Sequence, residues 1–117
     1  MAGVTAKRAN AMILALPGVE EATAHGFSGF KLRGSFFARL RDEDSVLVLR
    51  LPIPERELLM EAAPAIYFVT DHYRGYPSVL IRLAAIGADE LALRLEQAWR
   101  GKASKTMIKA FEATRTG

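Results

Sequence analysis

The segment Thr70–Tyr76 (TDHYRGY) holds the densest group of side chains that could do chemistry. In one hypothesis, His72 carries a proton, Asp71 orients its ring and Arg74 holds an anionic substrate. In the alternative, the segment is a structured loop in which Asp71 accepts backbone hydrogen bonds and Tyr76 covers a sheet edge. Neighbours in sequence do not form a catalytic triad by spacing alone, so we predict a protein that is not an enzyme. A small-molecule enzyme that uses Asp71, His72 and Arg74 is the remote alternative.

The two histidines, His25 and His72, are the candidate metal ligands, with Asp71 as a third. Their spacing matches no common metal motif, and His25 is better placed to hydrogen-bond within the glycine-rich turn that follows it. The glycines between residues 26 and 34 do not form a dinucleotide-binding fingerprint, because no long helix follows them. The absence of cysteine excludes disulfides, thiolate nucleophiles and Cys-based metal sites. We therefore predict neither a metal nor a cofactor.

Two consecutive segments, Ser35–Arg41 and Ser45–Leu51, alternate like β-strands and are predicted to form a hairpin around Glu43-Asp44. Pairing of Asp42 with Ser45 separates apolar from charged residues, and a slip of one residue would mix them. One face is then wholly apolar and is expected to lie on the core: Phe36, Ala38, Leu40, Leu47, Leu49 and Leu51. The opposite face is expected to meet solvent and to carry Phe37, Arg39, Arg41 and Arg50.

An aromatic ring among arginines on a sheet can stack on bases while the guanidinium groups pair with phosphates. The net charge of +3 is concentrated at the end of the chain, where residues 100–117 hold five Lys or Arg and one Glu. We therefore predict a non-catalytic module that binds nucleic acid, DNA or RNA, through the sheet face and the basic tail 101–117. The predicted binding residues are Phe37, Arg39, Arg41, Arg50, Arg74, Tyr76, Lys102, Lys105 and Lys109.

A competing hypothesis is a protein-interaction or chaperone-like adaptor domain. It rests on a short helix expected after Ser104, in which Met107, Ile108 and Phe111 form one apolar side. If this helix is free, it can recognise a protein partner. If it docks on its own domain, the same apolar residues belong to the core.

The elements that must position these residues are those of one small domain. Half of the 117 residues are apolar and a quarter are charged, which excludes a disordered chain, a fibre and a repeat array. Nothing approaches the ~20 apolar residues of a membrane span, and we expect a cytoplasmic protein. Predicted helices begin after Thr5, at Pro54 and at Asp89. Predicted strands cover Ala22–His25, Phe30–Arg33, Ser35–Arg41, Ser45–Leu51, Ile66–Val69 and Ser78–Leu83.

The order of these elements predicts an α+β fold, a mostly antiparallel sheet with helices packed on one face. The middle helix is expected to bury the stripe Leu58, Leu59, Ala62 and Ala63.

The chain resembles the MmcQ/YjbR-like family over roughly residues 5–113. The resemblance rests on Leu14–Glu21 (LALPGVEE), on Gly26–Leu40, on Tyr67–Pro77 (YFVTDHYRGYP) and on Asp89–Arg100. It implies a single domain over residues 1–117 with a double-wing fold, similar to type III secretion chaperones: helix, three strands, helix, two strands, helix. The family is often labelled DNA-binding by analogy, and it offers no catalytic residues to carry over.

Overall fold

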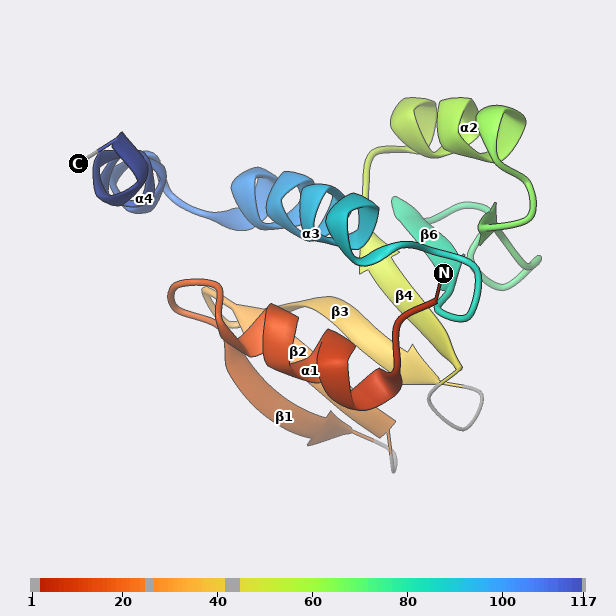
Figure 1. The fold of residues 1–117 in the computed structure, drawn as a ribbon, viewed down its shortest axis with the longest axis horizontal. Coiled ribbons are helices and arrows are strands. Elements are labelled where there is room, and N and C mark those ends of the chain that lie inside the picture. The colour runs from red at the N-terminus through yellow and green to blue at the C-terminus, as the bar shows by residue number, and fades with distance from the viewer. Residues whose placement is uncertain (1–2, 25–26, 42–44, 117) are drawn as a thin grey trace.

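The computed structural model describes residues 3–24, 27–41 and 45–116, and the chain folds around one sheet (Figure 1). The helices are α1 (Ala6–Leu14), α2 (Ile53–Ala62), α3 (Ala88–Lys102) and α4 (Lys105–Thr116). The strands are β1 (Glu20–Ala24), β2 (Phe27–Leu32), β3 (Ser35–Arg41), β4 (Val46–Arg50), β5 (Tyr67–Phe68) and β6 (Ser78–Arg82). Four strands precede α2, where the family pattern implies three. Among the described residues, no helix has both the length and the apolar character needed to cross a bilayer.

The six strands lie in the order β1-β2-β3-β4-β6-β5, and every neighbouring pair is antiparallel. The predicted α+β class is therefore confirmed. Arg39 lies opposite Val48 and Arg41 opposite Val46, which is the register that the apolar alternation of β3 and β4 favours. The expected partner of Ser45, Asp42, lies outside the described residues.

A β-bulge in β3 changes which phenylalanine faces the core. Phe30 pairs with Ala38, but the next residue, Lys31, pairs with Phe36, so Phe37 is an extra residue without a partner on β2. One extra residue inverts the alternation of side chains on its strand. Phe37 is 2% exposed and belongs to the core, whereas Phe36 lies on the opposite face with Arg39. The prediction that Phe37 faces solvent and Phe36 faces the core is wrong.

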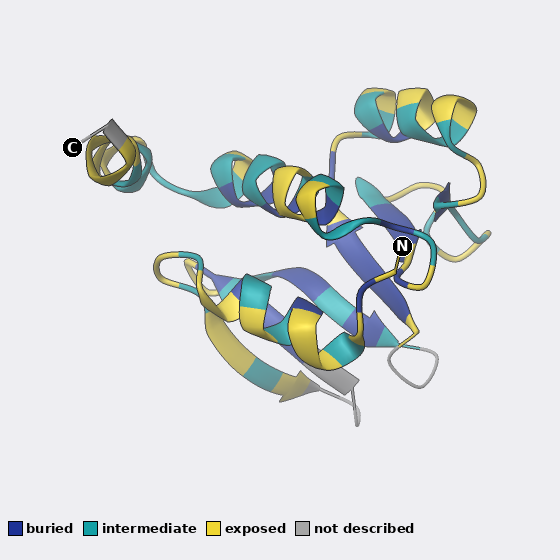
Figure 2. Cartoon of the chain, viewed as in Figure 1, coloured by how far each residue is buried: buried dark blue, intermediate teal, exposed yellow. Residues whose placement is uncertain are grey.

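The helices pack on one face of the sheet, and the core fills the space between the two layers. α1 contributes Ala9 and Ile13, and α3 contributes Leu91, Leu95 and Trp99. In Figure 2 the buried residues are concentrated in the central strands and on the inward sides of these helices. α1 begins at Thr5, whose hydroxyl accepts a hydrogen bond from the Arg8 backbone N–H.

The buried stripe of α2 differs from the predicted one by a rotation of the helix. Arg56 is 1% exposed, and Leu59 and Met60 pack against the core, while Leu58 is 67% exposed. Arg56, Leu59, Met60 and Ala63 keep the i, i+3, i+4, i+7 spacing of an inward face. An arginine thus lies on the inward face of α2, whereas the predicted stripe consisted of leucines and alanines alone.

The basic tail is the helix α4, and it docks on its own domain. Its cap is Ser104, whose Oγ accepts a hydrogen bond from the Met107 N–H at 3.1 Å. The ring of Phe111 lies 4.9 Å from that of Trp99, centroid to centroid. Met107 and Phe111 pack against the core, so the apolar side of this helix is in contact with its own domain.

Candidate functional site on the outer sheet face

Five cationic side chains belong to the face of the sheet that is turned away from the helices, here called the outer face. The alternation of the strands places Arg41 and Arg82 on this face, next to Val46 in the ladder. Arg39 and Arg50 follow by the same period of two, and Lys31 lies beside Phe36. The set is Lys31, Arg39, Arg41, Arg50 and Arg82.

Four of these cations lie over aromatic rings. The Lys31 Nζ is 4.9 Å from the centroid of Phe36, and the guanidinium carbon of Arg39 is 5.3 Å from it. Arg41 lies 5.8 Å from the ring of Tyr73, and Arg82 lies 4.0 Å from that of Phe68. Contacts of this kind hold cations beside the electron-rich ring faces. The outer face therefore joins positive charge to aromatic surface, as the sequence predicted, but with Phe36 in place of Phe37.

The Phe36 ring packs directly against the backbone of Gly29 on the neighbouring strand. A Cβ atom on Gly29 would lie 2.4 Å from Phe36 Cε1, a distance that no side chain tolerates. Because Gly29 has no side chain, the Phe36 ring can lie against the sheet at this position. We did not assign this role from the sequence, although the glycine between two strand residues was a signal for a close approach.

Among the described residues, few carboxylates lie close to these cations. Glu20 lies opposite Lys31 in the ladder between β1 and β2, at the edge of the same face. Arg39 and Arg50 take part in no ion pair within residues 3–24, 27–41 and 45–116. The ion pairs seen in these ranges belong to α2, to the segment 71–74 and to the two C-terminal helices. The positive charge at Arg39 and Arg50 is therefore available to an anion.

The segment 70–77 folds over the outer face at β4 and β6. Tyr73 packs against a small apolar cluster formed by Val46, Val48 and Leu80. This cluster is separate from the main core because the sheet lies between them. Part of the outer face is therefore covered, and the cationic residues surround the covered area.

The buried Arg56 holds this segment in place from α2. Its Nη1 donates to the carbonyl oxygens of Tyr73 at 3.3 Å, Tyr76 at 3.0 Å and Ser78 at 3.2 Å. Its Nη2 donates to the carbonyl of Arg74 at 3.0 Å. One guanidinium group thus donates to four carbonyls between Tyr73 and Ser78, and those of Tyr73 and Tyr76 also accept backbone hydrogen bonds within the turns. We did not predict this role from the sequence, although Arg56 lies one helical turn before Leu59 of the expected buried stripe.

The structure shows which contacts Asp71, His72 and Arg74 make. The Asp71 carboxylate is 99% exposed and pairs with Arg74 Nη2 at 3.2 Å. The ring of His72 lies edge-on to Tyr73, with centroids 4.8 Å apart, and 6.2 Å from that of Tyr76. Asp71 therefore contacts Arg74, and the ring of His72 lies among tyrosines. The other histidine, His25, lies outside the described residues.

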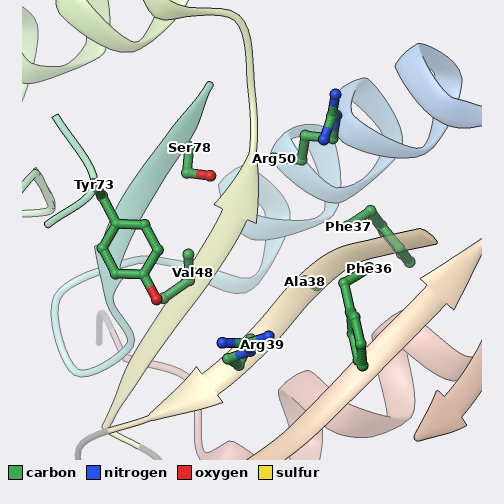
Figure 3. Close-up of a pocket in the computed structure, with 8 residues that line it drawn as sticks. All are labelled: Phe36, Phe37, Ala38, Arg39, Val48, Arg50, Tyr73 and Ser78. Carbon is green, nitrogen blue, oxygen red and sulfur yellow. The ribbon is translucent and has the colours of Figure 1, made fainter. Parts of the chain in front are cut away.

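A hollow of about 130 Å³ opens on the outer face between β3, β4 and the segment 70–77 (Figure 3). Figure 3 views it with the helices behind the strands. Arg39 and Tyr73 enter it from opposite sides, over Val48. The lining residues are Phe36, Phe37, Ala38, Arg39, Val48, Arg50, Tyr73 and Ser78.

The model of the YjbR family matches residues 14–101, well over half of the chain. The chain belongs to the YjbR family. Uncharacterised proteins of Mycobacterium tuberculosis and Mycobacterium bovis are 42% identical to it over 55 residues. That alignment covers 47% of this chain and 43% of each relative, so the match spans less than half of their length.

A crystal structure shows that the fold of this YjbR domain recurs in another protein. Protein DR2400 of Deinococcus radiodurans, assigned to the domain family DUF419, superimposes with a TM-score of 0.73 over 91% of this chain and 86% of its own. The two sequences are 18% identical, so the similarity concerns the fold alone.

The lysines of the basic tail of the YjbR domain lie away from the outer face. α4 docks on the helical side of the sheet, at the end of α3 (Figure 1). Lys105 and Lys109 are exposed on this helix, and the Lys102 carbonyl accepts a hydrogen bond from Arg33. Arg74 and Tyr76 lie on the segment that covers the outer face, and both are exposed. The predicted binding residues therefore fall into two groups.

Ion pairs fix the two C-terminal helices of the YjbR domain to one another. Arg100 contacts Glu96 at 2.9 Å and Glu112 at 2.8 Å, and Arg115 contacts Glu96 at 2.7 Å. The hydrogen bond from Arg100, with the nearby charge of Arg115, lowers the pKa of the Glu96 carboxyl. Arg100 at the end of α3 and Arg115 of the tail are therefore already paired with carboxylates.

A second polar contact joins β5 to α3 beneath the sheet. The hydroxyl of Tyr67, a residue that is 1% exposed, donates a hydrogen bond to the Glu90 carboxylate. Burial and the adjacent carboxylate both raise the pKa of Tyr67, because they disfavour the phenolate. This pair lies on the helical side of the sheet and fixes the short strand β5.

Proposed function

We propose that this YjbR domain is a non-catalytic module that binds single-stranded nucleic acid on its outer face. One observation carries the proposal: the ring of Phe36 lies on the sheet between Lys31 and Arg39, both within cation–π distance. An aromatic ring beside cations is the arrangement on which a base can stack while its phosphates are neutralised.

We expect single strands to bind better than duplexes, because only an unpaired base can lie flat on a side chain of an open sheet. The bases of a duplex are stacked on one another, so their faces do not reach a side chain on an open sheet. An unpaired base can lie on the Phe36 ring, which the contact with Gly29 holds against β2. Tyr76, 59% exposed, offers a second ring on the same side.

The charge of the outer face supports electrostatic attraction of a polyanion. Arg39 and Arg50 are free of ion pairs in the part of the chain that the structure describes, and Lys31 faces Glu20. If three cations neutralise three phosphates of a single strand, log affinity falls with log salt with a slope of about −2.

Fewer observations support the alternative hypothesis of a protein-interaction domain. The apolar side of α4, which motivated a recognition helix, packs against the core through Met107, Ile108 and Phe111. The enzyme alternative needs Asp71 to orient His72, but the Asp71 carboxylate contacts Arg74. Nucleic-acid binding is therefore the function that we put forward for testing.

Fluorescence anisotropy with an oligothymidylate of about 12 nucleotides, a length that single-strand-binding folds cover, tests the proposal at two salt concentrations. We expect the wild type to bind the single strand more tightly than a duplex of equal length. Phe36→Leu should weaken binding about tenfold, since stacking of one base contributes about 1–3 kcal/mol. Arg39→Gln should weaken it by a similar factor and make the salt slope shallower by about 0.7.

The matched control is Arg8→Gln, which removes the same charge from the exposed surface of α1, on the other side of the sheet. It should leave the affinity and the salt slope unchanged. A wild-type salt slope near zero, or an equal loss in Arg8→Gln and Arg39→Gln, would contradict the proposal.

A further inference from the structure

The hollow on the outer face is surrounded by hydrogen-bond donors that the protein does not use itself. Arg39, Arg50, Tyr73 and Ser78 line it, and each carries a side-chain N–H or O–H group. Within the described ranges, the side-chain polar atoms of these four residues form no hydrogen bond and no ion pair. Among the residues that the structure describes, no Asp or Glu lines the hollow. Donors and positive charge without a carboxylate favour an anionic ligand.

The size of the hollow limits what this anion can be. The hollow has a volume of about 130 Å³. Sites for drug-sized ligands occupy about 300–1,000 Å³. The hollow is therefore too small to enclose a drug-sized ligand, and a single tetrahedral oxyanion suits its size.

Hydrogen bonds and packing hold the residues around the hollow in place. Arg56 donates to the carbonyl oxygens of both Tyr73 and Ser78, the residues that contribute hydroxyl groups. Arg39 lies on β3 and is held at the rim by its contact with Phe36. The floor includes the buried side chain of Val48. A site whose donors are fixed before binding loses less entropy when its ligand arrives.

We propose that this hollow is a site for a single phosphate group, bound by Arg39, Arg50 and the hydroxyls of Tyr73 and Ser78. The inference rests on the proposed function for the polyanion that supplies the phosphate. Three sources share this chemistry: a phosphodiester within a strand, a terminal phosphate and free inorganic phosphate. In a bound strand, the hollow would fix the position of one phosphate while a base stacks on Phe36.

Titration of the 15N-labelled chain with inorganic phosphate, against sodium chloride at equal ionic strength, tests the site by NMR. We expect saturable shifts of the Val48 and Ser78 amides with phosphate and not with chloride. Ser78→Ala and Tyr73→Phe each remove one hydroxyl and should weaken phosphate binding about threefold to tenfold. Thr106→Val is the control, since it removes a hydroxyl from the exposed surface of α4, outside the hollow, and it should leave phosphate binding unchanged.

Oligonucleotides with and without a 5′ phosphate separate the sources. Tighter binding of the phosphorylated strand, lost in Ser78→Ala, assigns the hollow to a terminal phosphate. Equal binding of both strands, weakened alike by Ser78→Ala, assigns it to a phosphodiester.

The same data separate this site from the proposed function. If strands bind wild type, Ser78→Ala and Tyr73→Phe equally and inorganic phosphate shifts no amide at the hollow, the phosphate site is wrong and the proposed function stands. If phosphate binds at the hollow and no strand binds, the site stands and the proposed function is wrong.

Discussion

The ring of Phe36 occupies the space that a side chain on Gly29 would need. A Cβ atom there would lie 2.4 Å from Cε1 and 2.8 Å from Cδ1 of the ring. The contact depends on the bulge at Phe37, because without the extra residue Phe36 would point into the core. A glycine on β2 and a bulge in β3 thus place one half-buried aromatic ring among cations on the outer face.

Gly29→Ala should displace this ring and lower both stability and nucleic-acid affinity. Overpacking of this kind costs about 1–3 kcal/mol, which urea denaturation will measure. Gly75→Ala is the control, because a Cβ atom there meets nothing within 4 Å. An unchanged oligonucleotide affinity in Gly29→Ala would mean that Phe36 is not the stacking residue.

Arg56→Met should destabilise the domain by about 3 kcal/mol or more, since four carbonyls each lose a hydrogen bond from the buried guanidinium group. Hydrogen exchange should become faster at the amides of residues 73–78 before it does in the central strands. Glu57→Gln is the control, because the exposed Glu57 carboxylate lies 3.7 Å from Arg56 Nε and contributes little. Equal stability of Arg56→Met and wild type would refute this role.

Phe111→Ala should lower the free energy of unfolding by about 2 kcal/mol, because the ring packs half-buried against Trp99. Deletion of residues 103–117 should lower the melting temperature further, since it also removes the ion pairs of Arg100 and Arg115 with Glu112 and Glu96. Lys109→Ala, on the exposed side of α4, should leave the stability unchanged. A truncated chain with the wild-type melting temperature would show that α4 does not stabilise the domain.

The stability of the domain should fall as the pH rises above about 10. The pKa of Tyr67 is raised above its ordinary value of 10.0 by burial and by Glu90. The folded state therefore keeps a proton that the unfolded state releases above pH 10, and this stabilisation is lost as the pH rises toward the folded-state pKa. Tyr67→Phe should flatten the decline between pH 9 and about 11, measured by urea denaturation, whereas Tyr76→Phe should not. A decline that is identical in wild type and Tyr67→Phe would exclude this origin.

Patterns that are local in the chain were sufficient to predict much of the fold. The alternation of β3 and β4 predicted that Arg39 faces Val48, because one register alone keeps leucines on one side. The stripe of α3 and the cap at Thr5 are likewise local signals, since both depend on residues within a few turns. The YjbR segments predicted the family on the same basis.

The amino-acid sequence by itself determined the α+β class, the basic character of the hairpin and the absence of cysteine chemistry. The tertiary structure decided which phenylalanine faces outward, because Phe36 and Phe37 are equally apolar and only the pairing with β2 distinguishes them. It also decided that Arg56 is buried, since the carbonyls that it satisfies lie about twenty residues further along the chain. Contacts between residues distant in sequence depend on packing. The periodicity of a single segment does not identify the segment against which it packs.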